Sequence, residues 1–360
     1  MRFESKGKIL SFFGCTIFSS LMVASAFAQQ PGNSKICQDG VVRVIDGREF
    51  KLVWSDEFEG KQLNKNYWKN RVSGYGYGGN YAPEDANYLD GEGHLVMSMC
   101  ALPKEKVAKL VKSTRDIEAV DKLPAGKYIC QTNQLLTKEK FLYGYHEVRF
   151  KLPLIAGPGF CFWFPGVSAN STEIDVIEQT LYHKGKVCDY KSSTIHWYTG
   201  DYKEANHNYL SNQYQRSNES KAANVELIND ILMNQNIKLA DSSKRIKFID
   251  KSENGLIKQT SLSDNDHVRW DDSNWHTAAL LWTKDSYSFY YDGEFICKYD
   301  KGIEHKPKDA ILSLRCMAGL DDIIKSGKGE SVKDTPAKIL VDYYRVYKGG
   351  ETGEVLMPPQ

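Results

Sequence analysis

The sequence predicts an all-β fold, an antiparallel sandwich. Short segments rich in β-branched and aromatic residues recur along the chain, with turn residues between them. Several of these segments alternate apolar with polar residues, which is the period of a strand with one buried face. A repeating strand–helix–strand pattern, which would indicate a parallel sheet, is not seen. With 360 residues, 41% of them hydrophobic, the chain is long enough for one large or two modest domains.

The first 28 residues predict a secretory signal peptide. A basic start precedes an apolar run from residue 9 to residue 27, and Ala26-Phe27-Ala28 has the small-residue pattern of a cleavage site. A retained membrane anchor is the alternative interpretation. We therefore expect export to the periplasm, the cell surface or the medium, with a polar lead-in at residues 29–49.

The composition argues against two classes of function. A net charge of +1 provides no basic surface for nucleic acid. No segment after the signal peptide is long and apolar enough to span a bilayer.

The cysteines beyond the signal peptide form no Cys-x-x-Cys pair, so a zinc site is not expected, although export makes one or two disulfides plausible. We expect a monomer.

A single domain is expected over residues 50–348, followed by a frayed tail at 349–360. Asp292-Gly293 has the sequence of a tight hairpin turn and lies between two segments of strand character. The segments with strand character cover residues 50–54, 94–99, 145–152, 160–164, 194–198, 275–282, 287–291, 295–299, 310–315 and 339–347.

Three segments interrupt this succession of strands. Gly74–Asn80 is a glycine-rich aromatic loop, and its Tyr75 and Tyr77 are candidates for the rim of a cleft. Residues 101–127 are rich in lysine and are expected to form a surface excursion. Residues 203–268 form a second insertion, in which a short amphipathic helix is indicated by the helical spacing of Val225, Ile228, Ile231 and Leu232.

The stretch from residue 171 to residue 180 carries three carboxylates among β-branched residues. In a regular strand Glu173 and Asp175 would share one face, whereas Glu178 would point into the core. Burying a lone carboxylate is costly, so a regular strand is unfavourable here. A β-bulge at Val176 or Ile177 adds one residue to the strand and brings all three acids to the same face.

This arrangement has the chemistry of a retaining glycosidase. With the bulge, Glu173 and Glu178 are about 13 Å apart at their Cα atoms, because each strand residue advances about 3.3 Å. Two glutamates that lean together could close the gap between their carboxyl groups to the roughly 5–5.5 Å of a retaining pair. Asp175 could hydrogen-bond Glu173 and tune its titration. The alternative interpretation is a solvated acidic face.

Several landmarks of the sequence resemble glycoside hydrolase family 16, which includes laminarinases, lichenases, agarases, carrageenases and endo-β-galactosidases. These landmarks occur in the same order along the chain and cover roughly residues 50–348, apart from the two insertions. They are Trp54–Phe58, Gly144–Pro153, Glu173–Glu178, Ile195–Trp197, Asp292–Gly293 and Val341–Tyr347. The resemblance implies a β-jelly-roll, of the concanavalin-A-like type, with a long concave cleft.

The resemblance also implies a retaining mechanism that needs no cofactor for its chemistry. Glu173 matches the nucleophile, Glu178 the general acid/base and Asp175 the assisting acid between them. A protonated Glu178 would need a pKa above that of a free glutamate, and two neighbouring acids would raise it. The implied substrate is a polysaccharide or the glycan of a glycoprotein.

Sugar binding requires flat apolar surfaces and hydrogen-bonding groups. The candidates are Trp163, Trp197 and Tyr198, with His196 near the reacting sugar. For each tryptophan the alternative is simple core packing. His276 matches a strand position of the family and is expected to be structural.

Some family members hold a structural calcium ion away from the cleft. Asp342 and backbone groups near Glu57 match the positions that supply its ligands. The alternative is that Asp342 is an ordinary strand residue whose carboxylate has protein partners.

The sequence departs from the laminarinases ahead of the acids. They carry a Trp-Pro-Ala-x-Trp segment where this chain has Gly159–Trp163, without the first tryptophan and the proline. We therefore favour an endo-acting enzyme for the β-1,4 or β-1,3 linkages of a galactose-containing glycan, such as poly-N-acetyllactosamine or a mucin-type chain. The alternatives are an endo-β-1,3-glucanase, a transglycosylase and a lectin-like sandwich without turnover.

Overall fold

The structure, a computed structural model, describes most of the region that was expected to fold. The signal peptide, Tyr77, the expected helix near residue 228 and the C-terminal tail lie outside the described residues. The described residues are 42–76, 80–153, 158–166, 171–183, 186–199, 206–217, 246–251, 257–258, 274–316 and 337–349.

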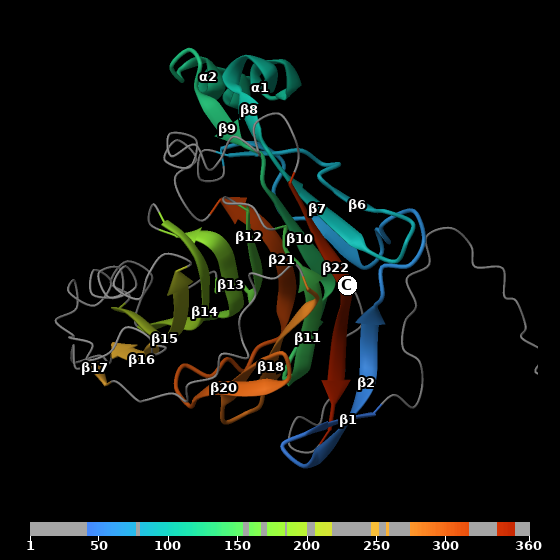
Figure 1. Cartoon of the computed structure of the whole chain (residues 1–360), viewed down its shortest axis with the longest axis vertical. Helices are drawn as coiled ribbons and strands as arrows, with labels where there is room; N and C mark the ends of the chain where they lie inside the picture. The colour runs from blue at the N-terminus through green and yellow to red at the C-terminus, as the bar shows by residue number, and fades with distance from the viewer. Residues whose placement is uncertain are drawn as a thin grey trace, which may run out of the picture. The chain divides into compact units, whose positions relative to one another are not determined.

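Two nine-stranded antiparallel sheets dominate the described residues, and they confirm the predicted all-β antiparallel architecture (Figure 1). Sheet A runs in the order β1 (Val42–Ile45), β2 (Arg48–Asp56), β22 (Ala337–Lys348), β11 (Gly144–Lys151), β18 (His276–Trp282), β19 (Tyr287–Tyr291) and β20 (Glu294–Tyr299), with β7 (Leu95–Met99) also on β22 and β6 (Asn87–Leu89) on β7.

Sheet B carries the acidic stretch. Its order is β17 (Ile257–Lys258), β16 (Ile246–Lys251), β15 (Asn206–Ser217), β14 (Lys186–Thr199), β13 (Thr172–His183), β12 (Pro158–Phe164), β21 (Lys308–Cys316), β10 (Asn133–Phe141) and β3 (Trp68–Asn70). Two further pairs are β4 (Gly74–Tyr75) with β5 (Tyr81–Ala82), and β8 (Ala101–Pro103) with β9 (Tyr128–Cys130).

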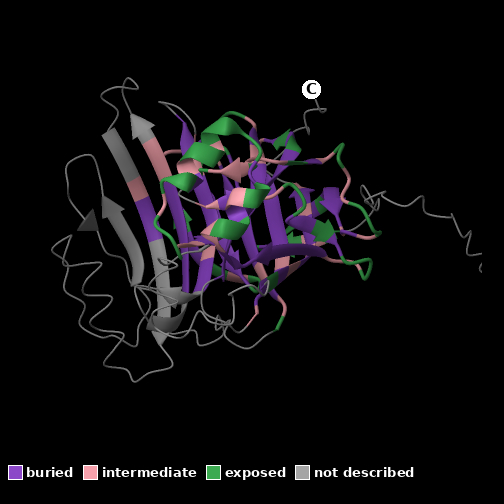
Figure 2. Cartoon of the chain, turned by 90° about the horizontal axis from the view of Figure 1, so that it is seen from above, coloured by how far each residue is buried: buried purple, intermediate pink, exposed green. Residues whose placement is uncertain are grey.

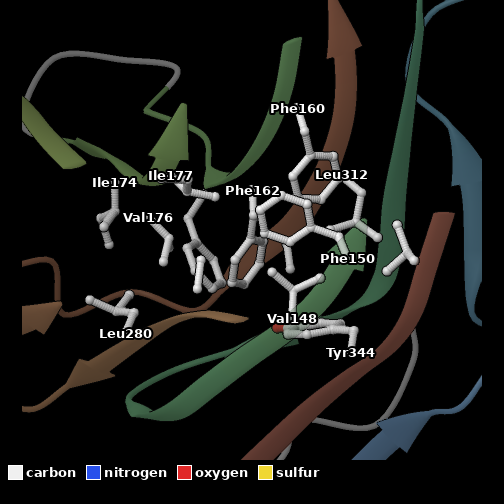
Figure 3. Packing of buried hydrophobic residues seen from close by; sticks show 14 of the residues in the cluster. Val148, Phe150, Phe160, Phe162, Ile174, Val176, Ile177, Leu280, Leu312 and Tyr344 are labelled. Carbon is white, nitrogen blue, oxygen red and sulfur yellow. The ribbon is translucent and has the colours of Figure 1, made fainter. Parts of the chain in front are cut away.

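The main core lies between the two sheets. Phe150 of β11 packs on Phe160 of β12, with ring centroids 4.3 Å apart. Figure 3 shows Ile174, Val176 and Ile177 of β13 among these buried side chains, and all three are completely buried. Each such side chain contributes roughly 1.5–3 kcal/mol when it leaves water. The face of β13 that carries these three residues is therefore fixed against the core.

Residues 101–127 form a small helical unit rather than an irregular excursion. It contains the described helices α1 (Lys104–Leu110) and α2 (Thr114–Asp121), which lie beside β8 and β9 in Figure 1 and carry many exposed residues in Figure 2. Val107 and Val120 are completely buried in a separate cluster with Tyr75 at its edge. The Asp116 carboxylate accepts from the Tyr75 N–H (3.3 Å), so the insertion supports the aromatic loop.

Sheet formation starts before the expected limit and continues into the second insertion. β1 and the beginning of β2 fall within the expected lead-in, because Asp46-Gly47 makes a turn with positive φ at both residues. Asp292-Gly293 does the same between β19 and β20, which confirms the predicted hairpin. Within the second insertion, β15, β16 and β17 extend sheet B beyond β14. None of the described helices has the length and apolar character that crossing a membrane requires.

Candidate active site

The predicted bulge is present in β13. Relative to β12, Trp163 pairs with Asp175 and Phe162 with Ile177, so Val176 is the additional residue. Relative to β14, the register also shifts between Asp175 and Glu178. Residues directly opposite one another in an antiparallel pair share a face. All three acids therefore lie on the face of sheet B that points away from the core.

A hydroxyl network from the other sheet supports the bulge. Ser193 of β14 donates from Oγ to the Val176 carbonyl (2.7 Å). The same Oγ lies 2.6 Å from the Tyr291 hydroxyl of β19, and Tyr299 of β20 donates to the Ser193 carbonyl (3.3 Å). A displaced backbone group in a core needs such a partner, since an unsatisfied one costs about 1–3 kcal/mol. Sheet A thus helps to fix the backbone between the acids.

The acids meet polar residues of β14 at the same level of the sheet. His196 is opposite Glu173, and its Nε2 lies 3.3 Å from Asp175 Oδ2. One ligand atom from each of these three side chains lies within 4.8 Å of the others. Ser192 is opposite Glu178 and donates from Oγ to its Oε2 (3.3 Å). Such a cluster can move protons, and its three donors could also hold a metal ion.

The environment of Glu173 changes its acidity. Burial, reinforced by the negative charge of Asp175, raises the pKa of Glu173 to about 7. His196, the Gly166 N–H and Arg71 act in the opposite direction. Burial alone would lower the pKa of His196, but its hydrogen bond to Asp175 and the charges of the two acids raise it. The raised pKa that the sequence predicts for Glu178 stays a prediction.

Gly166 makes a close contact with the start of β13. Its N–H is a hydrogen-bond donor to the Glu173 carboxylate. A Cβ atom at this position would lie 2.5 Å from the Glu173 backbone nitrogen and 2.8 Å from the Thr172 carbonyl carbon. Backbone atoms cannot move aside as the end of a side chain can, so only glycine fits here without displacing Glu173.

A buried ion pair holds the chain on both sides of this contact. Lys308 Nζ lies 2.9 Å from Glu304 Oε2, and their side chains are 7% and 5% exposed. Lys308 donates to the Pro165 carbonyl (2.7 Å), and Glu304 accepts from the Thr172 N–H (3.2 Å). The pair therefore ties the end of β12 to the residue before Glu173.

Trp163 lies on the acid face, and its surroundings are largely occupied. Its Nε1 donates to Ser313 Oγ (3.0 Å), and it is 9% exposed. The Arg71 guanidinium lies over its ring, 4.8 Å from the centroid. With Leu136, Cys161 and Ile311, Trp163 forms an apolar cluster beside the acids. One ring face is thus covered by arginine, and sugar stacking on Trp163 stays a prediction.

The other aromatic candidates are placed differently. Trp197 has the opposite parity from His196, packs against the main core and lies close to Gly302. Core packing is therefore the role that its surroundings support, and the structure does not bring it to the acid face. The side chain of Tyr198 lies outside the described part. Tyr209 of β15, which the sequence did not single out, lies beside His196 with ring centroids 5.9 Å apart.

The residues expected away from the cleft have protein partners. His276 Nδ1 lies 3.0 Å from Asp292 Oδ2 at the hairpin turn, which agrees with a structural role. Asp342 forms an ion pair with Arg149, and Arg345 binds both carboxylate oxygens of Glu57. Calcium takes six to eight oxygen ligands. The Asp342 carboxylate already pairs with the Arg149 guanidinium, which competes with its use as a calcium ligand. Calcium binding here stays a prediction.

The chain is similar to solved structures of carbohydrate-active enzymes. An endo-β-1,3-glucanase from Pyrococcus furiosus superposes with a TM-score of 0.52 at 22% identity, over 86% of this chain and 98% of that one. The catalytic domain of a laminarinase from Thermotoga petrophila gives 0.50 at 18% identity, over 84% and 99%. A structure described with the endo-acting O-glycanases that human gut bacteria express to initiate mucin breakdown gives 0.51 at 18% identity, over 86% and 94%.

Similarity at the level of sequence is more limited. No protein-family model matches the chain. A stretch of 183 residues, 48% of this chain, is 28% identical to the alpha subunit of clotting factor G from Tachypleus tridentatus. That match spans only 24% of the subunit. Together with the sheet order and the bulged acidic strand, the structural similarities confirm that this chain has the jelly-roll fold of the glycoside hydrolase family 16 endoglucanases that its sequence resembles.

Proposed function

We propose that this protein is a retaining endo-β-glycosidase. The observation that carries the proposal is the bulge at Val176, which presents Glu173, Asp175 and Glu178 on one face of sheet B. The endo-β-1,3-glucanases and the O-glycanase that share the fold support an endo-acting glycosidase. A lectin would not need three carboxylates on one face, and the raised pKa of Glu173 suits a reacting group better than a solvated surface acid.

The proposed chemistry is a double displacement. Ionised Glu173 attacks the anomeric carbon, a bond forms between that carbon and its carboxylate oxygen, and the glycosidic C–O bond breaks as Glu178 protonates the leaving oxygen. Water then attacks the same carbon, gives its proton to Glu178 and releases the Glu173 carboxylate. Asp175 and His196 would adjust the charge around Glu173 during both steps. No metal ion takes part in this proposal.

Replacement of the nucleophile tests the mechanism. Glu173→Gln keeps the size of the side chain but cannot form the glycosyl–enzyme bond, so hydrolysis should fall by several orders of magnitude while glycan binding persists. Full activity in Glu173→Gln would remove this residue from the mechanism. Activity that disappears with a chelator and returns with a divalent ion would favour metal-dependent chemistry at the Glu173–Asp175–His196 cluster instead.

For the substrate we propose a galactose-containing glycan, and the runner-up is a β-1,3-glucan. The departure at Gly159–Trp163 from the laminarinase pattern supports the first, while the similarity to endo-β-1,3-glucanases supports the second. A panel of laminarin, agarose, keratan and mucin O-glycans, with mass analysis of products, decides between them. Rapid cleavage of laminarin alone would exclude the galactan. Products longer than the starting oligosaccharide would indicate transglycosylation.

We also propose that the chain is exported. Its N-terminal basic and apolar pattern ends at Ala26-Phe27-Ala28, and a polysaccharide substrate is met outside the cytoplasm. Expression of the full chain in a Gram-negative host, fractionation and N-terminal sequencing should give a mature protein that starts at Gln29. Recovery of the uncleaved chain from the membrane fraction would favour the anchor.

A further inference from the structure

Arg71 occupies a position that neither the sequence motifs nor the proposed mechanism uses. It follows β3, and its backbone N–H donates to the Gln134 carbonyl of β10 (2.9 Å), which ties it to sheet B. From there its guanidinium reaches the ring of Trp163, 4.8 Å from the centroid. Trp163 is the direct neighbour of Asp175 across the strand pair. Arg71 is thus a cation at the edge of the acid cluster.

One nitrogen of this guanidinium has an unmet hydrogen bond. Arg71 Nη1 is buried and finds no hydrogen-bond partner among the described residues. Burying a charged donor without an acceptor is unfavourable, and most buried polar groups are satisfied. The electrostatic effect of Arg71 on Glu173 is attractive, but Glu173 does not accept a hydrogen bond from it. An acceptor supplied by a ligand would complete this site.

We propose that Arg71 is a substrate-binding residue whose Nη1 donates to an uncharged acceptor oxygen of the sugar held beside Glu173 on the Trp163 side. The acceptor would be a hydroxyl or an acetamido carbonyl oxygen. This inference rests on the proposed glycosidase function and adds a specificity-determining residue to it.

The surrounding charges favour an uncharged group over a sulfate or carboxylate. Glu173, Asp175 and Glu178 lie on the same face, and Asp175 is only 6% exposed. A second anion brought to Arg71 would meet the field of these acids at short range, where screening by solvent is weak. A hydroxyl or amide oxygen accepts the hydrogen bond without that repulsion.

A purely structural role is the competing explanation. In that case Arg71 would only cover Trp163 through a cation–π contact, and its loss would lower stability without changing catalysis. Arg149 offers a matched control, because its guanidinium also lies over a tryptophan ring, 5.0 Å from the Trp275 centroid. Arg149 lies on β11 of sheet A and pairs with Asp342, away from the acid face of sheet B.

The experiment compares Arg71→Met, Arg71→Lys and Arg149→Met with the wild type on whichever substrate of the panel is cleaved. Arg71→Met should lower kcat/KM on the order of 10- to 100-fold, as expected for a lost hydrogen bond to a charged group. The acid limb of its pH profile should move to higher pH, because Arg71 lowers the pKa of Glu173. Arg71→Lys keeps the charge, so its acid limb should stay in place while kcat/KM falls. Arg149→Met should retain wild-type kcat/KM.

Three results would overturn the proposal. The first is kcat/KM within twofold of the wild type in both Arg71 variants. The second is a loss in Arg71→Met that Arg149→Met shares. The third is a sulfated or carboxylated form of the substrate that is cleaved faster by the wild type, with the advantage lost in Arg71→Met.

If Arg71→Met does not fold, Arg71→Lys decides: a fivefold or larger loss of kcat/KM at unchanged Tm supports the role, and wild-type kinetics oppose it. Failure of the glycosidase proposal is seen separately, as a wild type that cleaves no glycan or a fully active Glu173→Gln.

Discussion

Glu173 should destabilise the folded protein when it is ionised, and Glu173→Gln should relieve this. Its pKa rises from the ordinary 4.5 to about 7, chiefly through burial and then through the charge of Asp175. A group whose folded pKa is raised contributes stability below its unfolded pKa and loses that contribution as the pH rises through the folded value. Gln resembles the protonated acid at every pH. The advantage of the variant should therefore be small at pH 4 and large at pH 8.

The magnitude follows from the two pKa values. One pKa unit corresponds to about 1.36 kcal/mol. Between 4.5 and about 7, the ionisation of Glu173 costs the folded state up to about 3 kcal/mol at pH 8, and well under about 1 kcal/mol at pH 4. Such a difference is a considerable part of the roughly 5–15 kcal/mol by which proteins are stable.

Urea unfolding at a series of pH values measures this directly, with the midpoint and slope fitted separately. The control is Glu118→Gln, the same chemical change at an exposed position of α2. The difference in unfolding free energy between Glu173→Gln and the wild type should grow from pH 4 to pH 8, whereas the control should show a constant difference. A constant difference in Glu173→Gln as well would refute the idea that Glu173 is held in a desolvating site.

Four further expectations concern activity and the support of the site. If ionised Glu173 is the nucleophile, kcat/KM should fall below a midpoint near pH 7 in a pH–rate profile, and an acid limb near pH 4 would contradict the assignment. Gly166→Ala should displace Glu173 and lower kcat/KM on the order of 100-fold, with only a modest decrease in Tm. Unchanged kinetics would show that the backbone at residue 166 can shift to accommodate a Cβ atom without moving Glu173. Lys308→Met leaves Glu304 buried without its cation and should lower the free energy of unfolding in urea by about 3–5 kcal/mol. Ser193→Ala removes the hydrogen bond to the Val176 carbonyl and should lower it by about 1–3 kcal/mol. A loss below about 0.5 kcal/mol in either variant would show that the contact contributes little to stability.

The sequence predicted those features that depend on local alternation. The parity of side chains along a strand and the cost of burying Glu178 were sufficient to place the bulge at Val176 or Ile177. The same alternation separates His196 from Trp197, so the sequence already contained the reason to assign Trp197 to the core. The Asp46-Gly47 turn was equally readable, since it repeats the signal at Asp292-Gly293.

Features that depend on distant parts of the chain were not predictable in this way. Arg71 and Tyr209 reach the acid face because β3 and β15 lie at particular places in sheet B, and strand order is not encoded in any short motif. The helices between residues 104 and 121 are only seven and eight residues long, which is too short for a helical period to stand out. A local signal was present, because the Ser113 hydroxyl accepts from the Asp116 N–H as an N-cap.

The bulge at Val176 also determines which changes of length the site can tolerate. Val176 acts as a spacer between two stretches of strand whose side chains are out of step. Deleting it would leave Glu173, Asp175 and Glu178 at even intervals in a flat ladder, still on one face and at a similar separation, but without the carbonyl that Ser193 binds. Inserting one residue here would also make the spacing even, so a regular ladder would still keep the three acids on one face, but with Glu178 two strand positions, roughly 6–7 Å, farther from Glu173. Insertions and deletions at this point are therefore not equivalent: both keep the acids on one face, but only the deletion keeps Glu173 and Glu178 at a separation that their side chains can bridge.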